Sequence, residues 1–158
     1  MPYLLALMLS IFTLTGCQSA YYSAMEQVGY HKRDIMVDRV EDAKQSQQDA
    51  QQEFTSALEA LSALTQFDGD ELETIYNQIN DKYQDSEKAA QEVSDRIAAI
   101  EDVSDALFAE WQSELDLYTS TKLKRASEQK LKETQRSYNT MLSAMKRAED
   151  KMTPVLNT

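Results

Sequence analysis

Phe67-Asp68-Gly69-Asp70 separates two long stretches of helix-forming sequence and decides how the chain folds. Gly69 can adopt the left-handed backbone conformation that ends a helix. Asp70 and Glu73 have the spacing of an N-cap and capping-box pair, which starts the next helix. Because a loop of about four residues joins two helices most simply as an antiparallel pair, we predict a helical hairpin around this segment.

The other helix boundaries follow from the few remaining breaks in a chain that is poor in glycine and proline. Tyr118-Thr119-Ser120-Thr121 brings together weak helix formers whose hydroxyls can cap a helix. Thr153-Pro154 stops the last helix. We therefore predict helices near residues 20–66, 71–118 and 121–152. The predicted fold class is all-α, an elongated antiparallel helical hairpin or three-helix coiled-coil bundle.

Apolar residues recur in each predicted helix at alternating steps of three and four. Such a pattern forms a seam for a partner helix, so we expect its aromatic and methionine side chains to be core rather than part of a cofactor site. The first seam comprises Met36, Val40, Ala43, Gln47, Ala50, Phe54, Ala57, Leu61 and Leu64. The second comprises Tyr76, Ile79, Tyr83, Ser86, Ala90, Val93, Ile97, Ile100, Ser104, Leu107 and Trp111. The third comprises Leu131, Thr134, Tyr138, Met141, Met145, Ala148 and Met152.

The charges on either side of residue 118 support a turn there. Residues 68–116 hold 15 acids and 3 bases, whereas residues 119–158 hold 9 bases and 4 acids. Acids therefore end the second helix and bases begin the third, so each group opposes its own helix dipole. A chain that folds back turns the two groups into partners, namely Glu110, Glu114 and Asp116 with Lys122, Lys124 and Arg125.

The composition limits the size and the partners of the chain. Its 158 residues carry 27 Asp and Glu against 16 Lys and Arg, a formal net charge of -11, which fits one modest domain. This balance argues against nucleic acid as a partner, because neutralising phosphates requires clustered cations. With only 4 Phe and 1 Trp, narrow seams between helices are favoured over a thick globular core.

A short apolar leader ends at Leu14-Thr15-Gly16-Cys17, which contains the only cysteine of the chain. A small residue before a lone cysteine behind an apolar run is the arrangement by which bacterial lipoprotein precursors present the thiol that receives lipid. The run is too short for a transmembrane helix and suits the core of a signal peptide. We expect a cleaved signal peptide over residues 1–16, lipidation by fatty acids such as palmitate at Cys17, a lipid-anchored tether over 17–20 and a helical domain over 21–158.

The residues around the cysteine also predict a location. Gln18 follows Cys17, and an Asp at that place is what retains lipoproteins in the inner membrane of bacteria with two membranes. We therefore expect a protein anchored in the inner leaflet of the outer membrane and facing the periplasm. The leader lacks the usual basic start, so we expect its beginning to be mis-assigned or missing.

Tyr21-Tyr22-Ser23-Ala24-Met25-Glu26, Val28 to Ile35 and Asp38 to Ala43 resemble the opening of a bacterial lipoprotein family known as domain of unknown function 2959. The segments around Phe67, Glu101 and Trp111 are similar too, so the resemblance covers about residues 17–156. It implies a helical envelope protein without an assigned activity, and therefore no functional residues to carry over. Members of the family continue beyond the position of Pro154, so we expect this chain to be truncated at its C-terminus.

A search for chemistry in the sequence finds little. No Ser-His-Asp set, Cys-His pair or glycine-rich phosphate loop is present, and Cys17 is committed to lipid. His31, Asp34, Asp38 and Glu41 lie on one helical stripe, where two neighbours could share a divalent metal. Structural zinc usually takes four converging ligands, so we expect a solvated acidic face, no metal and no cofactor.

Tyr21, Tyr22 and Tyr30 follow the anchor closely and leave two readings open. Tyrosine favours the membrane interface, so these rings could rest on lipid headgroups, and they could equally cover the open end of the hairpin. For the whole chain we expect a non-enzymatic spacer, scaffold or adaptor, bound to the membrane through Cys17 and to an envelope protein or a second copy of itself. The alternative is an envelope binding module or sensor that takes peptidoglycan or a cationic ligand on its acidic second helix.

Overall fold

The computed structural model describes residues 16–63 and 72–152, with the backbone alone for residues 16–19. Four helices account for nearly all of these residues: α2 (Gly16–Gln27), α3 (Lys32–Ala63), α4 (Leu72–Leu115) and α5 (Thr121–Asp150). The prediction of an all-α chain is confirmed, since the described ranges contain no strand. The break predicted at residues 67–70 and most of the leader lie outside the described residues.

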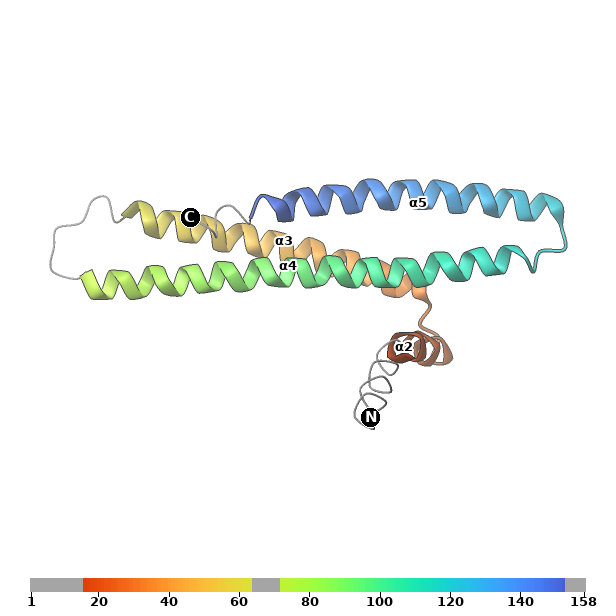
Figure 1. Cartoon of the computed structure of the whole chain (residues 1–158), viewed down its shortest axis with the longest axis horizontal. Coiled ribbons are helices and arrows are strands. Elements are labelled where there is room, and N and C mark those ends of the chain that lie inside the picture. The colour runs from red at the N-terminus through yellow and green to blue at the C-terminus, as the bar shows by residue number, and fades with distance from the viewer. Residues whose placement is uncertain (1–15, 64–71, 153–158) are drawn as a thin grey trace, which may run out of the picture.

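The three long helices α3, α4 and α5 lie along one another and alternate in direction (Figure 1). Two ion pairs between α3 and α4 show that these helices are antiparallel. Asp42 meets Arg96 at 3.3 Å, whereas Glu53, further along α3, meets Lys82, earlier in α4, at 3.7 Å. At 1.5 Å per residue the 44 residues of α4 span about 66 Å, so the molecule is a rod.

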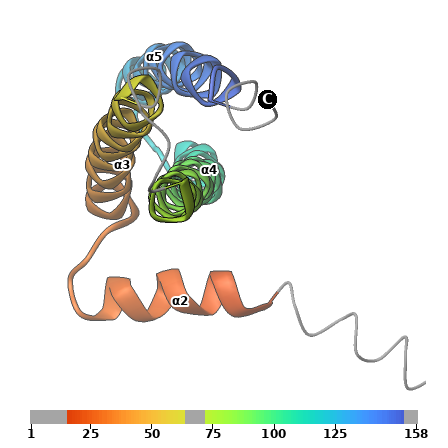
Figure 2. The ribbon, with the colours of Figure 1, turned by 90° about the vertical axis from the view of Figure 1, so that its left-hand side faces the viewer.

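A narrow core runs between the three long helices (Figure 2). Most of the residues that the seams predicted for the middle of each helix are buried there. Small side chains on α3 allow close approach of the larger ones on the other helices. The main cluster comprises Ala43, Ala50, Val93, Ile97, Ile100, Tyr138 and Met145. The rings of Phe108 and Tyr138 add an edge-to-face contact between α4 and α5, with centroids 5.4 Å apart.

The turn predicted between α4 and α5 is present. α4 ends at Leu115, and Ser120 caps the N-terminus of α5, where its hydroxyl accepts a hydrogen bond from the backbone N–H of Leu123 at 3.4 Å. Lys124 pairs with Asp116 at 3.2 Å across this turn. The expected partnership of acids at the end of one helix with bases at the start of the next is therefore seen for this pair.

The prediction of one continuous helix over residues 20–66 is wrong, because the chain turns sharply at Gly29. This glycine has φ +86°, the left-handed conformation. Its N–H donates to the carbonyl of Glu26 at 3.0 Å, and the N–H of Tyr30 donates to the carbonyl of Met25 at 2.9 Å. This pair of bonds is the Schellman arrangement that ends a helix. The chain therefore forms four described helices, where we predicted three.

The turn at Gly29 sends α2 across the side of the rod, roughly perpendicular to the long helices, and α4 and α5 continue past it (Figures 1 and 2). Tyr22 on α2 is buried against Ile35 of α3 and Val103 of α4. This contact forms a second, smaller core beside the start of α3. We call the end of the rod where α3 begins and α4 ends the anchor end, because α2, which contains Cys17, lies in this half of the molecule.

Replacing Gly29 with alanine should lower the free energy of unfolding by about 1–2 kcal/mol, the cost of a Cβ in the left-handed conformation. A Cβ at this position would meet no atom within 4 Å, so the cost comes from the backbone alone. Chemical denaturation would measure the loss. Gly29→Asn should lose less, because asparagine visits this conformation more readily. Equal and negligible losses in the two variants would show that the turn does not require a positive φ.

Candidate functional site

Side chains from all four helices meet at the anchor end and surround a polar pocket of about 190 Å³. α2 and the start of α3 form one side of this pocket, and the end of α4 and the first turns of α5 form the other. Charged groups from three helices converge there, around Lys32. We define the polar pocket by Glu26, His31, Lys32, Glu110, Trp111 and Ser127.

Lys32 connects three of the helices in this pocket. It is the first residue of α3, and its ammonium contacts the carboxylate of Glu26 on α2 and that of Glu110 on α4, the latter at 3.3 Å. Its side chain is only 13 % exposed. A cation at a helix N-terminus opposes the helix dipole, so the two carboxylates offset that cost as well as the desolvation.

The pKa values of Lys32 and Glu26 show that both side chains are charged at neutral pH. Burial by itself would lower the pKa of Lys32, but hydrogen bonds to Glu26 and Glu110 outweigh it and raise the pKa above its ordinary 10.5. The hydrogen bond from Lys32 holds the pKa of Glu26 below its ordinary 4.5, against the opposing effect of burial. Lys32 is therefore protonated at neutral pH, and its two ion pairs join α2, α3 and α4.

The contribution of this joint to stability should depend on pH in a defined direction. A carboxylate with a lowered pKa stabilises the fold fully above about pH 4.5 and loses this effect as the pH falls through its folded pKa. A lysine with a raised pKa stabilises fully below about pH 10.5 and loses the effect as the pH rises through its folded value. The difference in melting temperature between the wild type and Lys32→Gln should therefore be constant across neutral pH and shrink in acid.

Thermal melts between about pH 3 and pH 8 would test this, with the exposed Lys130→Gln as the matched control. The control variant should show little difference from the wild type at any pH. A Lys32→Gln effect that was as large at pH 3 as at pH 7 would contradict the ion-pair explanation.

Trp111 closes the pocket towards α5. Its indole Nε1 donates to the hydroxyl of Ser127 at 2.9 Å, which ties the end of α4 to the second turn of α5. The sequence placed Trp111 on the seam of α4, and the structure finds it half-buried there. The pocket thus contains an indole and a lysine that is paired with two carboxylates. These contacts hold the helices together.

The stripe of candidate metal ligands lies next to the pocket but does not converge. His31, Asp34, Asp38 and Glu41 are all exposed, and His31 precedes the first turn of α3. The backbone N–H of His31 donates to the carboxylate of Asp34 at 3.3 Å, so Asp34 caps the helix. Within residues 16–63 and 72–152, no three His, Cys, Asp or Glu side chains come together as a metal site would require.

Cys17 lies in the first turn of α2, and Gly16 is its first residue. Leu14 and Thr15 lie outside the described residues. Residues 17–20, which we expected to form a tether, have helical backbone. None of the described helices is long and apolar enough to cross a membrane.

The three tyrosines near Cys17 differ in their surroundings. Tyr22 is buried against Ile35 of α3 and Val103 of α4. Tyr21 and Tyr30 are about half exposed. The ring of Tyr21 meets that of Tyr22 edge-on, with centroids 5.4 Å apart.

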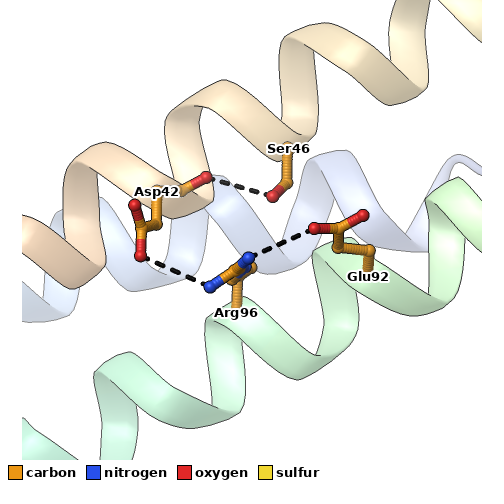
Figure 3. A network of polar contacts seen from close by, with 4 residues as sticks. All are labelled: Asp42, Ser46, Glu92 and Arg96. Carbon is orange, nitrogen blue, oxygen red and sulfur yellow. Dashed lines mark hydrogen bonds and ion pairs between the residues drawn. The ribbon is translucent and has the colours of Figure 1, made fainter.

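A second polar network joins α3 and α4 at the middle of the rod (Figure 3). Arg96 reaches across to the carboxylate of Asp42 at 3.3 Å and along its own helix to Glu92 at 3.2 Å. The hydroxyl of Ser46 donates to the backbone carbonyl of Asp42 at 3.0 Å. The charged side chains are partly exposed, so each pair contributes at most about 1 kcal/mol and chiefly fixes how the two helices align.

Sequence reasoning missed the joint at Lys32, although a signal was available. Two bases, Lys32 and Arg33, begin α3 and oppose its dipole. Bases at the start of a helix also supported the turn predicted near residue 118, because they need acids from another helix as partners. At the start of α3, the same reasoning predicts that acids on other helices pair with Lys32 and Arg33. Glu26 could not be recognised as such a partner while residues 20–66 were read as one helix.

Comparisons with known proteins give one match. A family model described as "Protein of unknown function (DUF2959)" matches residues 21–158. Searches of the curated proteins and of the solved structures found no match.

Proposed function

The chain belongs to the family described as Protein of unknown function (DUF2959), and from this premise we propose that it is a lipid-anchored spacer, scaffold or adaptor of the bacterial cell envelope. It acts without catalysis. Lipid on Cys17 holds it to the inner leaflet of the outer membrane, and the rod extends into the periplasm. Residues 1–16 are the signal peptide that is removed when the lipid is attached.

One observation carries the proposal: Cys17 lies on a separate short helix that crosses the side of a rod about 66 Å long, in the half where α3 begins. An anchor on this short helix leaves the three long helices free to extend away from the point of attachment. Tyr21 on α2 and Tyr30 just after it are about half exposed, which suits an interface with lipid headgroups. The arrangement supports a protein that separates a membrane surface from a contact at its far end.

The charged side chains support a structural role over a catalytic one. Those around Lys32, Arg96 and Lys146 form ion pairs between helices. Lys32, which a catalytic role would require to release its proton, is held protonated by two carboxylates. A spacer needs such joints because its helices must keep their alignment over a long and narrow core.

The alternative is a binding module or sensor that takes peptidoglycan or a cationic ligand on the acidic α4. A shallow groove between α3 and α4 favours it, with Glu87, Glu92 and Asp95 on its surface. Arg39, Lys88 and Arg96 line the same groove, so its field is mixed rather than uniformly negative. The spacer and adaptor role is therefore the stronger proposal.

Sedimentation with purified peptidoglycan sacculi separates the two proposals. A binding module should bind sacculi in a saturable way, with an affinity that falls as salt screens exposed charges. The spacer or adaptor should remain in the supernatant at physiological salt, and in cells should form site-specific crosslinks to another envelope protein. Saturable binding to sacculi that Glu92→Gln weakens would favour the sensor and count against the adaptor.

A further inference from the structure

The turn between α4 and α5 forms the tip of the rod at the anchor end, where these two helices continue past α2 (Figure 1). Residues 116–123 are all exposed. The larger apolar and aromatic side chains among them have exposed fractions of 80 % for Leu117, 58 % for Leu123 and 40 % for Tyr118. An exposed apolar patch rimmed by polar groups marks a contact with another protein or with a membrane. We call this surface the tip patch and define it by Leu117, Tyr118, Lys122, Leu123 and Arg125.

The segments 64–71 and 153–158 start too far away to cover the tip patch. At 1.5 Å per residue, the 30 residues of α5 place the start of segment 153–158 about 45 Å from the turn. The 44 residues of α4 place the end of segment 64–71 about 66 Å from it. An extended chain spans at most about 3.6 Å per residue, so the two segments reach at most about 22 Å and 29 Å. The leader is removed in the proposed function, and so it leaves the patch free as well.

Two free cations lie beside the apolar side chains of the tip patch. Lys122 and Arg125 are exposed, share one face of α5 and make no ion pair with any residue that the structure describes. The acids closest in sequence to the turn are placed elsewhere, since Asp116 pairs with Lys124 at 3.2 Å and Glu114 lines the polar pocket. The N-terminus of α5 adds positive potential at the same place. Apolar side chains flanked by cations suit a contact with the headgroup layer of a phospholipid membrane.

The tip patch and the anchor can touch one membrane at the same time. Tyr118 lines the polar pocket together with Glu26 of α2, so the turn lies beside the end of α2. Cys17 precedes Gln27 by about 15 Å along this helix. Figure 1 shows α2 to one side of the rod and the turn at its tip, and no other described element lies outside the line that joins them. A flat lipid surface along this line meets both and leaves the far end of the rod pointing away from the membrane.

We propose that the tip patch is a second membrane contact, made with phospholipid headgroups. Leu117 and Leu123 enter the headgroup layer, and Lys122 and Arg125 pair with lipid phosphates. The proposal rests on the proposed function, in which lipid on Cys17 brings the anchor end to the membrane. It adds the direction of the rod, because a single anchor lets the molecule pivot whereas two contacts fix its inclination. The patch binds weakly by itself, but the anchor makes the second contact intramolecular and so raises its effective concentration.

Quenching of a dye by nitroxide-labelled lipid tests the proposal on the lipidated full-length chain. The chain is placed in vesicles of phosphatidylethanolamine with a minor share of phosphatidylglycerol, in which some lipids carry a nitroxide just below the headgroup. An environment-sensitive dye is attached to a cysteine introduced by Leu117→Cys or, in the matched control chain, by Thr140→Cys. Thr140 is exposed on α5, about 30 Å further from the turn. Flotation of the vesicles shows that each chain is attached to the membrane.

The nitroxide lipid should quench the dye at position 117 strongly and at position 140 only at background. The combined change Lys122→Glu and Arg125→Glu should lower the ratio of quenched to unquenched dye at position 117 at least about fivefold, because it replaces attraction to phosphates by repulsion. Lys132→Glu with Arg136→Glu makes the same change of charge further along α5 and should leave the ratio as it is. Leu123→Gln should lower the ratio as well, since it removes an apolar side chain from the lipid.

The outcomes distinguish this contact from the anchor. Chains that float with the vesicles but are not quenched at position 117, or are quenched equally at both positions, would overturn the tip contact and leave the anchor in place. Equal effects of the two charge changes would also overturn it, because the cations of the patch would then have no particular role. A wild-type chain that fails to float would refute the anchor and, with it, this second contact.

Discussion

Replacing Cys17 with alanine should abolish the attachment of lipid completely, because the chain contains no other thiol. Cells grown with a clickable palmitate analogue should give a labelled wild-type protein and an unlabelled Cys17→Ala variant. The variant should also keep residues 1–16 and be heavier by that segment, because removal of a lipoprotein leader follows modification of the cysteine. Each buried methylene of a fatty acid contributes about 0.8 kcal/mol to membrane affinity, so the lipid rather than the helix supplies the anchor.

Ser19→Ala is the matched control for this experiment, as a small change in the same helical turn that leaves the thiol in place. It should be labelled and processed like the wild type. Label that persists in Cys17→Ala, or a wild-type protein without label, would contradict the proposal that lipid on Cys17 anchors the protein. The fold would be unaffected by either result.

Replacing Ile100 with alanine should produce the largest loss of stability among conservative changes in the core. Ile100 is fully buried in the main cluster between α3, α4 and α5. Truncation of such a side chain costs about 2–5 kcal/mol through lost transfer free energy and the cavity that remains. A small domain has only about 5–15 kcal/mol in total, so the urea midpoint should fall markedly.

Leu123→Ala is the control, because this leucine is 58 % exposed on α5 and its truncation should change stability by less than about 0.5 kcal/mol. Denaturation followed by far-ultraviolet circular dichroism compares the two variants. Similar midpoints for the two would mean that the three long helices do not share the core seen in the structure.

The buried middle of the rod could be predicted from the sequence because heptad spacing reports helix-to-helix contact directly. Val93, Ile97 and Ile100 on α4 were predicted to lie on a seam and are buried there. Tyr138 and Met145 on α5 were predicted in the same way, and the charge reversal near residue 118 correctly indicated a turn. These features are local in sequence, so periodicity and charge suffice to find them.

The two ends of the rod could not be predicted in this way, because they depend on where other helices stop. Val103 was outside the predicted seam and is buried, since Tyr22 of α2 covers it after the turn at Gly29. Tyr76 was on the seam and is exposed, since α5 ends before reaching it. A heptad pattern shows that a side chain can pack against a helix but does not show how far the partner helix extends.

The candidate site was predicted even less completely for a related reason. The carboxylates that pair with Lys32 come from α2 and α4 and not from its own helix. The stripe from His31 to Glu41 was correctly read as one exposed face. Contacts between helices bring together residues distant in the sequence, and no periodicity within one helix reveals them.

Measuring how far each end of the rod lies from the membrane tests the proposed function most directly. In vesicles with acceptor dyes on the lipid headgroups, the lipidated chain carries a donor dye on a cysteine introduced by Leu117→Cys or by Glu59→Cys. Leu117 lies in the turn at the anchor end and Glu59 near the far end of α3, and lipid on Cys17 keeps its sulfur from reacting with the dye. We expect strong energy transfer from position 117 and little from position 59, which the length of α4 places about 60 Å away. Equal transfer from the two positions would mean that the rod lies flat on the membrane and would contradict a role as a spacer or adaptor.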